Sequence, residues 1–132
     1  YKIVDLTKLS NEIGVIIGSS DKNHIIIEGH LAHIFSSDIV DIVIVLRTRP
    51  NILKERLSKR EWSDSKVYEN LEAEALDICT YEAVEIHGKK VNEVNTSDMD
   101  VEEVANIVIE IINSKKHFPP GNINFLEELY GV

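Results

Sequence analysis

The chain has 132 residues, and its 14 Lys and Arg against 23 Asp and Glu give a formal net charge of −9. The length is typical of one domain, and an apolar fraction of 43% excludes a wholly disordered chain. The single cysteine, Cys79, excludes a disulfide framework and a multi-cysteine zinc site. The acidity argues against non-specific nucleic-acid binding over the whole surface, although it leaves room for a local basic patch.

Two segments are nearly continuous in aliphatic residues and are predicted to be strands, residues 24–28 (HIIIE) and 41–46 (DIVIVL). Neither alternates apolar with polar residues, which is typical of strands buried on both faces in a parallel sheet covered by helices. Weaker strand patterns lie at residues 2–4 and 91–94.

Three helices are predicted from apolar residues at helical spacing. The first begins at Pro50, a residue suited to the first helical position, and extends to Arg60. The second spans residues 67–79. The third follows Asp100, which forms a capping-box pattern with Glu103. The apolar positions of the third helix are Val101, Val104, Ala105, Val108, Ile111 and Ile112.

The alternation of strands and helices predicts an α/β fold with three layers, in which helices cover both faces of a mostly parallel sheet. Residues 119–121 (PPG) interrupt this pattern, so we divide the chain into a core of residues 1–117 and a C-terminal tail of residues 118–132. Apolar residues in the tail, Phe125 among them, are expected to dock on the core.

A basic string extends from Val45 to Arg60 (VLRTRPNILKERLSKR). It places Arg47 at the carboxyl end of a predicted buried strand, the edge at which open α/β sheets bind ligands. Arg56 and Arg60 follow four residues apart and therefore share a helix face. Guanidinium groups that converge there can hold phosphate oxygens and stack on a base, whereas the alternative is a solvated basic helix end.

These residues resemble the nucleoside monophosphate kinases, and among them the small adenylate-kinase-like ATPases of ribosome assembly (coilin-interacting nuclear ATPase, or adenylate kinase isoenzyme six). The strand-end arginine followed by R-L-x-x-R is shared widely by adenylate kinases. Narrower similarities to this subfamily are its carboxylate-x-histidine motif at residues 28–30 (EGH), its lid helix at residues 65–75 (SKVYENLEAEA) and an archaeal type of tail at residues 120–129. The resemblance covers residues 1–129.

The resemblance implies a P-loop nucleoside monophosphate kinase-like fold with a short lid at about residues 60–75. It implies phosphoryl transfer from ATP, with Mg²⁺ as cofactor, to AMP, and ATP hydrolysis as a second activity. It also implies a role in maturing the small ribosomal subunit, through a complex with a platform ribosomal protein and an indirect contact with rRNA. The expected location is the cytoplasm, or the nucleus in a eukaryote, with no membrane partner.

Within this resemblance, Glu28 can hold a magnesium-bound water and His30 can orient or deprotonate an attacking water. We therefore expect Glu28, His30 and Arg60 to be catalytic. Thr7 is expected on the monophosphate side. The expected nucleotide-binding residues are Arg47, Arg56, Arg60, Asn70 and Ser97, of which Ser97 lies in the segment that corresponds to the family's adenine loop. The alternatives are a helix N-terminal acid with a hydrogen-bonded histidine, or a transition-metal site at His30 and His33.

The sequence departs from the family at its beginning. Members start with a strand and the phosphate loop G-x-x-x-x-G-K-[ST], neither of which precedes Tyr1. Residues 14–22 (GVIIGSSDK) do not have the glycine spacing of this loop or its adjacent Gly-Lys-Ser/Thr. The segment between Gly18 and His24 is also shorter than the monophosphate-binding helical segment that the family has at this position. Because the absent strand is central in the family's sheet, we expect an incomplete chain, with a break between Gly14 and Asn23 and an empty slot between strands.

Three functional hypotheses follow. The first is the nucleotide phosphotransferase with ATPase activity described above. The second is a non-catalytic ribosome-assembly protein that keeps a protein-binding surface but has lost the phosphate loop. The third is another phosphotransferase of the same fold, such as a shikimate or nucleoside kinase, against which the EGH triplet argues.

Overall fold

The computed structural model describes residues 4–130. The elements, in chain order, are α1 (Leu6–Ser19), η1 (Ala32–Ile34), β1 (Val43–Arg47), α2 (Pro50–Ser58), α3 (Asp64–Ala75), α4 (Ile78–His87), η2 (Gly88–Lys90), β2 (Val91–Asn95), α5 (Val101–Ile112) and α6 (Leu126–Tyr130).

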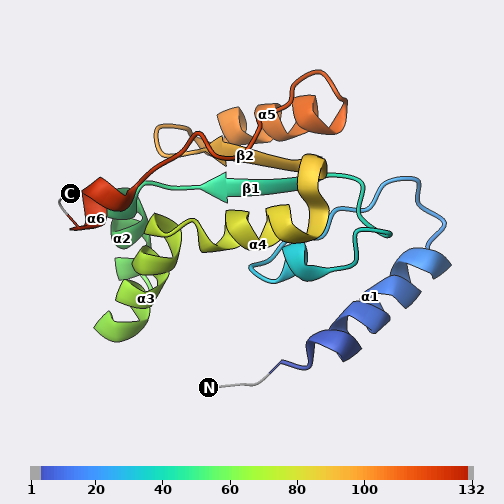
Figure 1. The fold of residues 1–132 in the computed structure, drawn as a ribbon, viewed down its shortest axis with the longest axis horizontal. Helices are drawn as coiled ribbons and strands as arrows, with labels where there is room; N and C mark the ends of the chain where they lie inside the picture. Colours follow the sequence, from blue (N-terminus) through green and yellow to red (C-terminus); the bar gives the residue numbers. More distant parts are fainter. Residues whose placement is uncertain (1–3, 131–132) are drawn as a thin grey trace.

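A parallel pair of strands, β1 and β2, forms the centre of the fold, with Val43 opposite Val91 and Arg47 opposite Asn95. Helix α4 packs on one face of the pair, and α5 lies over the other (Figure 1). The core between α4 and the strands contains Val43, Val45, Ala83 and Val91. The predicted α/β fold with a parallel sheet is therefore confirmed, as are strands close to residues 41–46 and 91–94.

The predicted strand at residues 24–28 is wrong, because this segment lies outside any helix or strand. Ile25 and Ile26 are 42% and 77% exposed. A strand requires a neighbour for its backbone hydrogen bonds, and within residues 4–130 β1 pairs only with β2. The weaker strand prediction at residues 2–4 lies outside the described residues except for Val4, which is not in a strand.

Helix α1 has no counterpart among the predicted helices, and it passes unbroken through Gly14 and Gly18. The expected chain break is therefore not found across residues 14–19. Asp5 caps the helix by accepting a hydrogen bond from the Lys8 N–H at 3.1 Å. No residue of α1 is buried, and the helix stands apart from the sheet in Figure 1.

The single helix predicted over residues 67–79 is instead two helices, α3 and α4, separated at Asp77. Asp77 has left-handed backbone angles, with φ 56° and ψ 31°. In a continuous helix the Glu74 carbonyl would accept the N–H of Ile78. Here it accepts a hydrogen bond from Arg47 Nη2 at 2.7 Å, so a tertiary contact replaces the helical one. The periodicity of the sequence could not reveal this break.

The capping box at the start of α5 is confirmed, since the Glu103 N–H donates to Asp100 Oδ1 at 2.8 Å. The inward face of this helix differs from the predicted one. Val104, Ile107, Val108 and Ile111 are partly or fully buried, whereas Val101 is 87% exposed. Because α5 is apolar on several sides, its sequence alone left the rotation of the helix open.

The tail docks on the core as expected. Phe125 is only 4% exposed, and α6 contacts both α2 and α3. Helix α2 begins at Pro50 as predicted but ends at Ser58, two residues before Arg60. None of the helices within residues 4–130 has the length and apolar character needed to cross a membrane.

Candidate functional site

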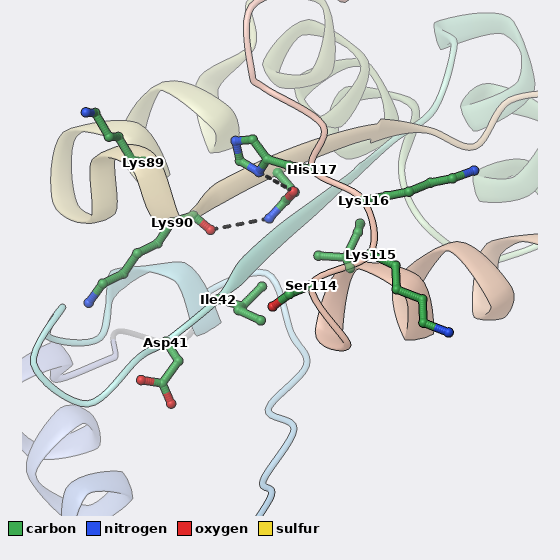
Figure 2. Close-up of a pocket in the computed structure, with 10 residues that line it drawn as sticks. Asp41, Ile42, Lys89, Lys90, Ser114, Lys115, Lys116 and His117 are labelled. Atoms are coloured by element: carbon green, nitrogen blue, oxygen red, sulfur yellow. Dashed lines mark hydrogen bonds between the residues drawn. The ribbon is translucent and has the colours of Figure 1, made fainter.

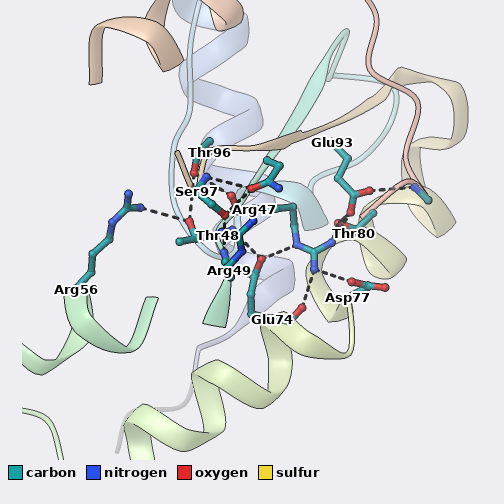
Figure 3. A network of polar contacts seen from close by, with 12 residues as sticks. Arg47, Thr48, Arg49, Arg56, Glu74, Asp77, Thr80, Glu93, Thr96 and Ser97 are labelled. Atoms are coloured by element: carbon teal, nitrogen blue, oxygen red, sulfur yellow. Dashed lines mark hydrogen bonds and ion pairs between the residues drawn. The ribbon is translucent and has the colours of Figure 1, made fainter. Parts of the chain in front are cut away.

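The loops that follow β1 and β2 are joined at the carboxyl edge of the sheet (Figure 3). The Thr96 N–H donates to the Arg47 carbonyl at 2.8 Å, and the Thr48 and Thr96 hydroxyls lie 3.2 Å apart. The Arg49 N–H donates to Ser97 Oγ at 2.8 Å. Because these bonds fix both loops to each other, the edge is a rigid platform, and this platform is the candidate site.

Arg47 lies beneath this platform and is 1% exposed. Its Nε donates to Glu74 Oε1 at 2.6 Å, its Nη2 donates to Asp77 Oδ1 at 2.6 Å, and its Nη1 donates to Glu93 Oε2. The ring of Phe125 covers the guanidinium carbon at 5.3 Å. Figure 3 shows the carboxylates arranged around one guanidinium group, so one buried cation joins β1, β2 and the α3–α4 junction.

Burial acts to lower the pKa of Arg47, but the hydrogen bonds of Glu74, Asp77 and Glu93 and the charge of Glu74 outweigh it, so the pKa is raised above its ordinary value. The guanidinium is therefore a permanent cation whose donors face protein carboxylates. The expectation that Arg47, Arg56 and Arg60 face one open cleft is wrong for Arg47, because its side chain is enclosed by the protein.

Arg56 and Arg60 are exposed at this end of the molecule. Arg56 Nη1 donates to Thr48 Oγ1 at 3.4 Å, which brings its guanidinium to the platform. Arg60 stacks on the Trp62 ring at 5.1 Å, and the Lys66 ammonium lies 4.0 Å from the same ring. Both arginines keep donors that solvent or an anion can reach, so their nucleotide-binding role stays a prediction.

Two further expected nucleotide-binding residues differ in their surroundings. Ser97 is 7% exposed and part of the platform, where its Oγ also donates to Asn95 Oδ1 at 2.5 Å. Asn70 is exposed on α3, and its Nδ2 donates to the carbonyl of Lys66 in the same helix at 2.8 Å. The structure thus places Ser97, which accepts from the Arg49 N–H, and Arg56, which donates to Thr48, on the same platform. It does not bring Asn70 to the platform by any hydrogen bond among the described residues.

Glu28, His30 and Thr7 are exposed, and all three precede β1 in the chain. Gly29, between the first two, has φ +146°, which turns the chain toward η1. Within residues 4–130 neither Glu28 nor His30 makes a side-chain hydrogen bond or ion pair. Thr7 lines a shallow groove of about 380 Å³ between α1 and η1. Their catalytic and monophosphate-binding roles stay predictions.

The alternative metal site at His30 and His33 is wrong for the described residues, where no group of three His, Cys, Asp or Glu side chains could hold a metal ion. His30 is exposed, whereas His33 is buried with its Nδ1 3.8 Å from Cys79 Sγ and its Nε2 3.8 Å from Glu82 Oε1. The two histidines therefore face different surroundings.

Sequence reasoning missed Glu93 and Asp77 as partners of Arg47. A signal for Glu93 was present, because it is a charged residue inside the predicted strand at residues 91–94, and a carboxylate inside a buried strand requires a cation or several hydrogen bonds. No signal marked Asp77, whose role depends on the helix break.

A groove of about 560 Å³ lies at the amino ends of the strands, opposite the platform (Figure 2). Lys89, Lys90, Lys115 and Lys116 line it. The lysine side chains diverge from one another in Figure 2, and Lys90 is held by the carbonyls of Ser37 and Val40 at 2.6 and 2.9 Å. None of the expected site residues lies in this groove.

Comparison with known proteins identifies the family of the chain. A family model, AAA_18, described as an AAA domain, matches residues 2–77. The chain is 48% identical over 106 residues to a protein of Methanothermobacter thermautotrophicus, 38% over 147 residues to one of Archaeoglobus fulgidus, and 42% over 126 residues to one of Methanosarcina barkeri, all named "Putative adenylate kinase".

These matches cover 80%, 98% and 96% of this chain, and 61%, 80% and 65% of the respective relatives. The chain thus spans less than two thirds of two of these three relatives. The family model covers more than half of the chain, and the chain belongs to the AAA_18 family of AAA domains.

Proposed function

We propose that this chain carries the nucleotide-facing part of an adenylate kinase, which transfers a phosphoryl group from ATP to AMP. One observation supports the proposal most: Arg56 reaches the platform formed by Thr48, Thr96 and Ser97 at the carboxyl edge of two parallel strands. Open α/β sheets bind ligands at that edge, and an exposed guanidinium there suits phosphate oxygens. The names of the archaeal relatives support the same activity.

The residues present fit a magnesium–nucleotide complex in one respect. Mg²⁺ in kinases is usually bound through one or two carboxylates and the substrate phosphates, and Glu28 is an exposed carboxylate able to accept hydrogen bonds from magnesium-bound water. When bound, the ion would neutralise charge on the phosphates. Arg56 and Arg60 would bind phosphate oxygens, Ser97 would face the base, and His30 would take a proton from water in ATP hydrolysis.

The finer statements belong to the same proposal. ATP hydrolysis is a second activity, and the protein acts in maturation of the small ribosomal subunit with a platform ribosomal protein, as the resemblance of residues 28–30 and 65–75 to that subfamily implies. A direct check is affinity isolation of the protein from its own cell lysate. Co-isolation of small-subunit proteins supports this role, and their absence contradicts it.

The nucleotide proposal is tested by measuring ATP affinity for Arg56→Ala and Arg60→Ala. Lys54→Ala is the matched control, because Lys54 is an exposed cation on α2 whose spacing places it on the side away from Arg56. Each arginine variant is expected to weaken ATP binding about 10- to 100-fold, since a charge-assisted hydrogen bond contributes roughly 1.5–3 kcal/mol. Equal affinities for all variants, with unchanged thermal unfolding, would contradict the proposal.

A further inference from the structure

The C-terminal tail runs beside β2 and then reaches the helices at the candidate site (Figure 1). The Glu93 N–H donates to the carbonyl of Phe118 at 2.9 Å, and the Gly121 N–H donates to Glu93 Oε1 at 3.0 Å. Helix α6 then lies against α2 and α3, where Tyr130 Oη donates to Glu72 Oε2 at 3.0 Å. The tail therefore connects the sheet to the two helices that follow β1.

Phe125 is the deepest residue of this tail. Its side chain is 4% exposed, and its ring covers the Arg47 guanidinium at 5.3 Å. The remaining sides of that guanidinium are occupied by the carboxylates of Glu74, Asp77 and Glu93. Phe125 thus supplies an apolar cover on the one side of the guanidinium that the carboxylates do not occupy. Together they leave Arg47 and Glu93 each 1% exposed and Glu74 17% exposed, whereas Asp77 at the rim is 43% exposed.

Arg47 in turn holds the carboxyl end of α3. It binds Glu74 twice, through the carboxylate at 2.6 Å and through the backbone carbonyl at 2.7 Å. Glu74 Oε1 also accepts the Thr48 N–H at 3.0 Å, which joins the end of α3 to the platform. Ion pairs strengthen as the local dielectric constant falls, so the hold on α3 depends on the cover above Arg47.

We propose that Arg47 and Phe125 are positioning residues: the tail covers the guanidinium, and the covered guanidinium fixes α3 against the sheet edge at which nucleotide is bound. Only the consequence for nucleotide binding rests on the proposed function. The link between the tail and α3 runs through Arg47, beside the direct contacts of α6 with α3, and it does not depend on nucleotide binding. Arg47 thereby acts through Glu74 and α3 and touches no phosphate.

The link is tested in the full chain by hydrogen exchange of backbone amides. Phe125→Ala is expected to accelerate exchange in residues 66–76 about tenfold or more, with a smaller change in β1 and β2, because α3 loses its fixed contact while the sheet keeps its own core. Phe118→Ala is the matched control, since it removes the same side chain from the same tail but leaves the backbone bonds to β2 in place. Phe125→Leu retains an apolar cover and is expected to restore most of the protection.

Unchanged exchange in residues 66–76 of Phe125→Ala would overturn the proposal, as would equal acceleration in all elements. ATP affinity is then measured with Mg²⁺ present, and Phe125→Ala is expected to weaken it about tenfold while Phe118→Ala leaves it unchanged. If the parent chain does not bind ATP, the proposed function fails, and the exchange result still decides the link. If the parent binds ATP and Phe125→Ala binds it equally well, the positioning role fails.

Discussion

Glu93 shows how a carboxylate is accommodated inside the β2 strand. Its side chain is 1% exposed. Oε2 accepts hydrogen bonds from Arg47 Nη1 and from Thr80 Oγ1, the second at 2.7 Å, and Oε1 accepts from the Gly121 N–H at 3.0 Å. Burial of a charge costs several kcal/mol unless its hydrogen bonds are complete, and here each oxygen has a donor.

Substitution Glu93→Gln retains the size of the side chain but removes its charge and places an amide N–H₂ opposite a donor. We expect the free energy of unfolding to fall by about 3 kcal/mol, because Arg47 is left with a partly unpaired buried charge. Urea denaturation measures the change. Glu55→Gln, on the exposed face of α2, is the control and should change the free energy by less than about 0.5 kcal/mol. Similar losses for both variants would contradict the role of Glu93.

Cys79 is a half-buried thiol beside His33. Burial raises its pKa above the ordinary value of 9.0, and the charges of Glu82 and Glu74 raise it further. The folded state therefore disfavours the thiolate. Its contribution to stability is complete below about pH 9 and is lost as the pH rises through the raised pKa of the folded state.

We predict that iodoacetamide alkylates Cys79 more slowly in the native chain than in urea at pH 8, because the thiolate is the reacting form. The rate is followed by mass spectrometry. We also expect the free energy of unfolding to decrease above pH 9 in the parent and to decrease less in Cys79→Ala. Equal alkylation rates in native and unfolded chains would show that the thiol is not shielded.

At the scale of elements, α5 ends at a position with left-handed backbone angles that is occupied by Ser114 instead of glycine. The Lys115 N–H donates to the Glu110 carbonyl at 2.9 Å and the Ser114 N–H donates to the Ile111 carbonyl at 3.0 Å, the two bonds of a Schellman motif. Ser114 occupies the left-handed position with φ 58°, which glycine usually fills.

Substitution Ser114→Gly should therefore raise the free energy of unfolding by about 0.5–1 kcal/mol, since the left-handed conformation costs an L-residue roughly 1–2 kcal/mol and glycine little. Ser58→Gly, at the last position of α2, is the matched control and should lower it, because glycine has the poorer helix propensity there. Thermal unfolding of both variants measures the signs. A decrease for Ser114→Gly would show that the left-handed backbone of Ser114 is not strained.

The sequence predicted those elements whose stability is local or depends on burial between two helical layers. Pro50 and the Asp100–Glu103 capping box act within one turn, so their helix starts were found. The break at Asp77 and the enclosure of Arg47 depend on contacts between residues 27 to 46 positions apart, which no local pattern encodes. Strand position alone therefore predicts an Arg47 side chain that faces a ligand at the carboxyl edge of the sheet, whereas the side chain lies buried beneath that edge.

At the scale of the whole molecule, a large part of the aliphatic surface is left uncovered. Ile26 is 77% exposed, and on α1 Val15 is 70% and Ile16 59% exposed. Phe118 covers one edge of β2, whereas no strand within residues 4–130 pairs with the far edge of β1. Exposed apolar patches and unpaired strand edges both favour association between chains.

We therefore predict that the chain self-associates as its concentration increases, and that Val15→Lys combined with Ile26→Lys reduces this association. The substitutions change the net charge from −9 to −7, which by itself weakens repulsion between chains. The control pair Asn11→Lys and Asn23→Lys makes the same charge change at exposed polar positions. Light scattering across a concentration series separates the two effects. If the apolar pair associates as strongly as the control pair, the exposed aliphatic side chains are not what drives association, and the unpaired edge of β1 becomes the better explanation.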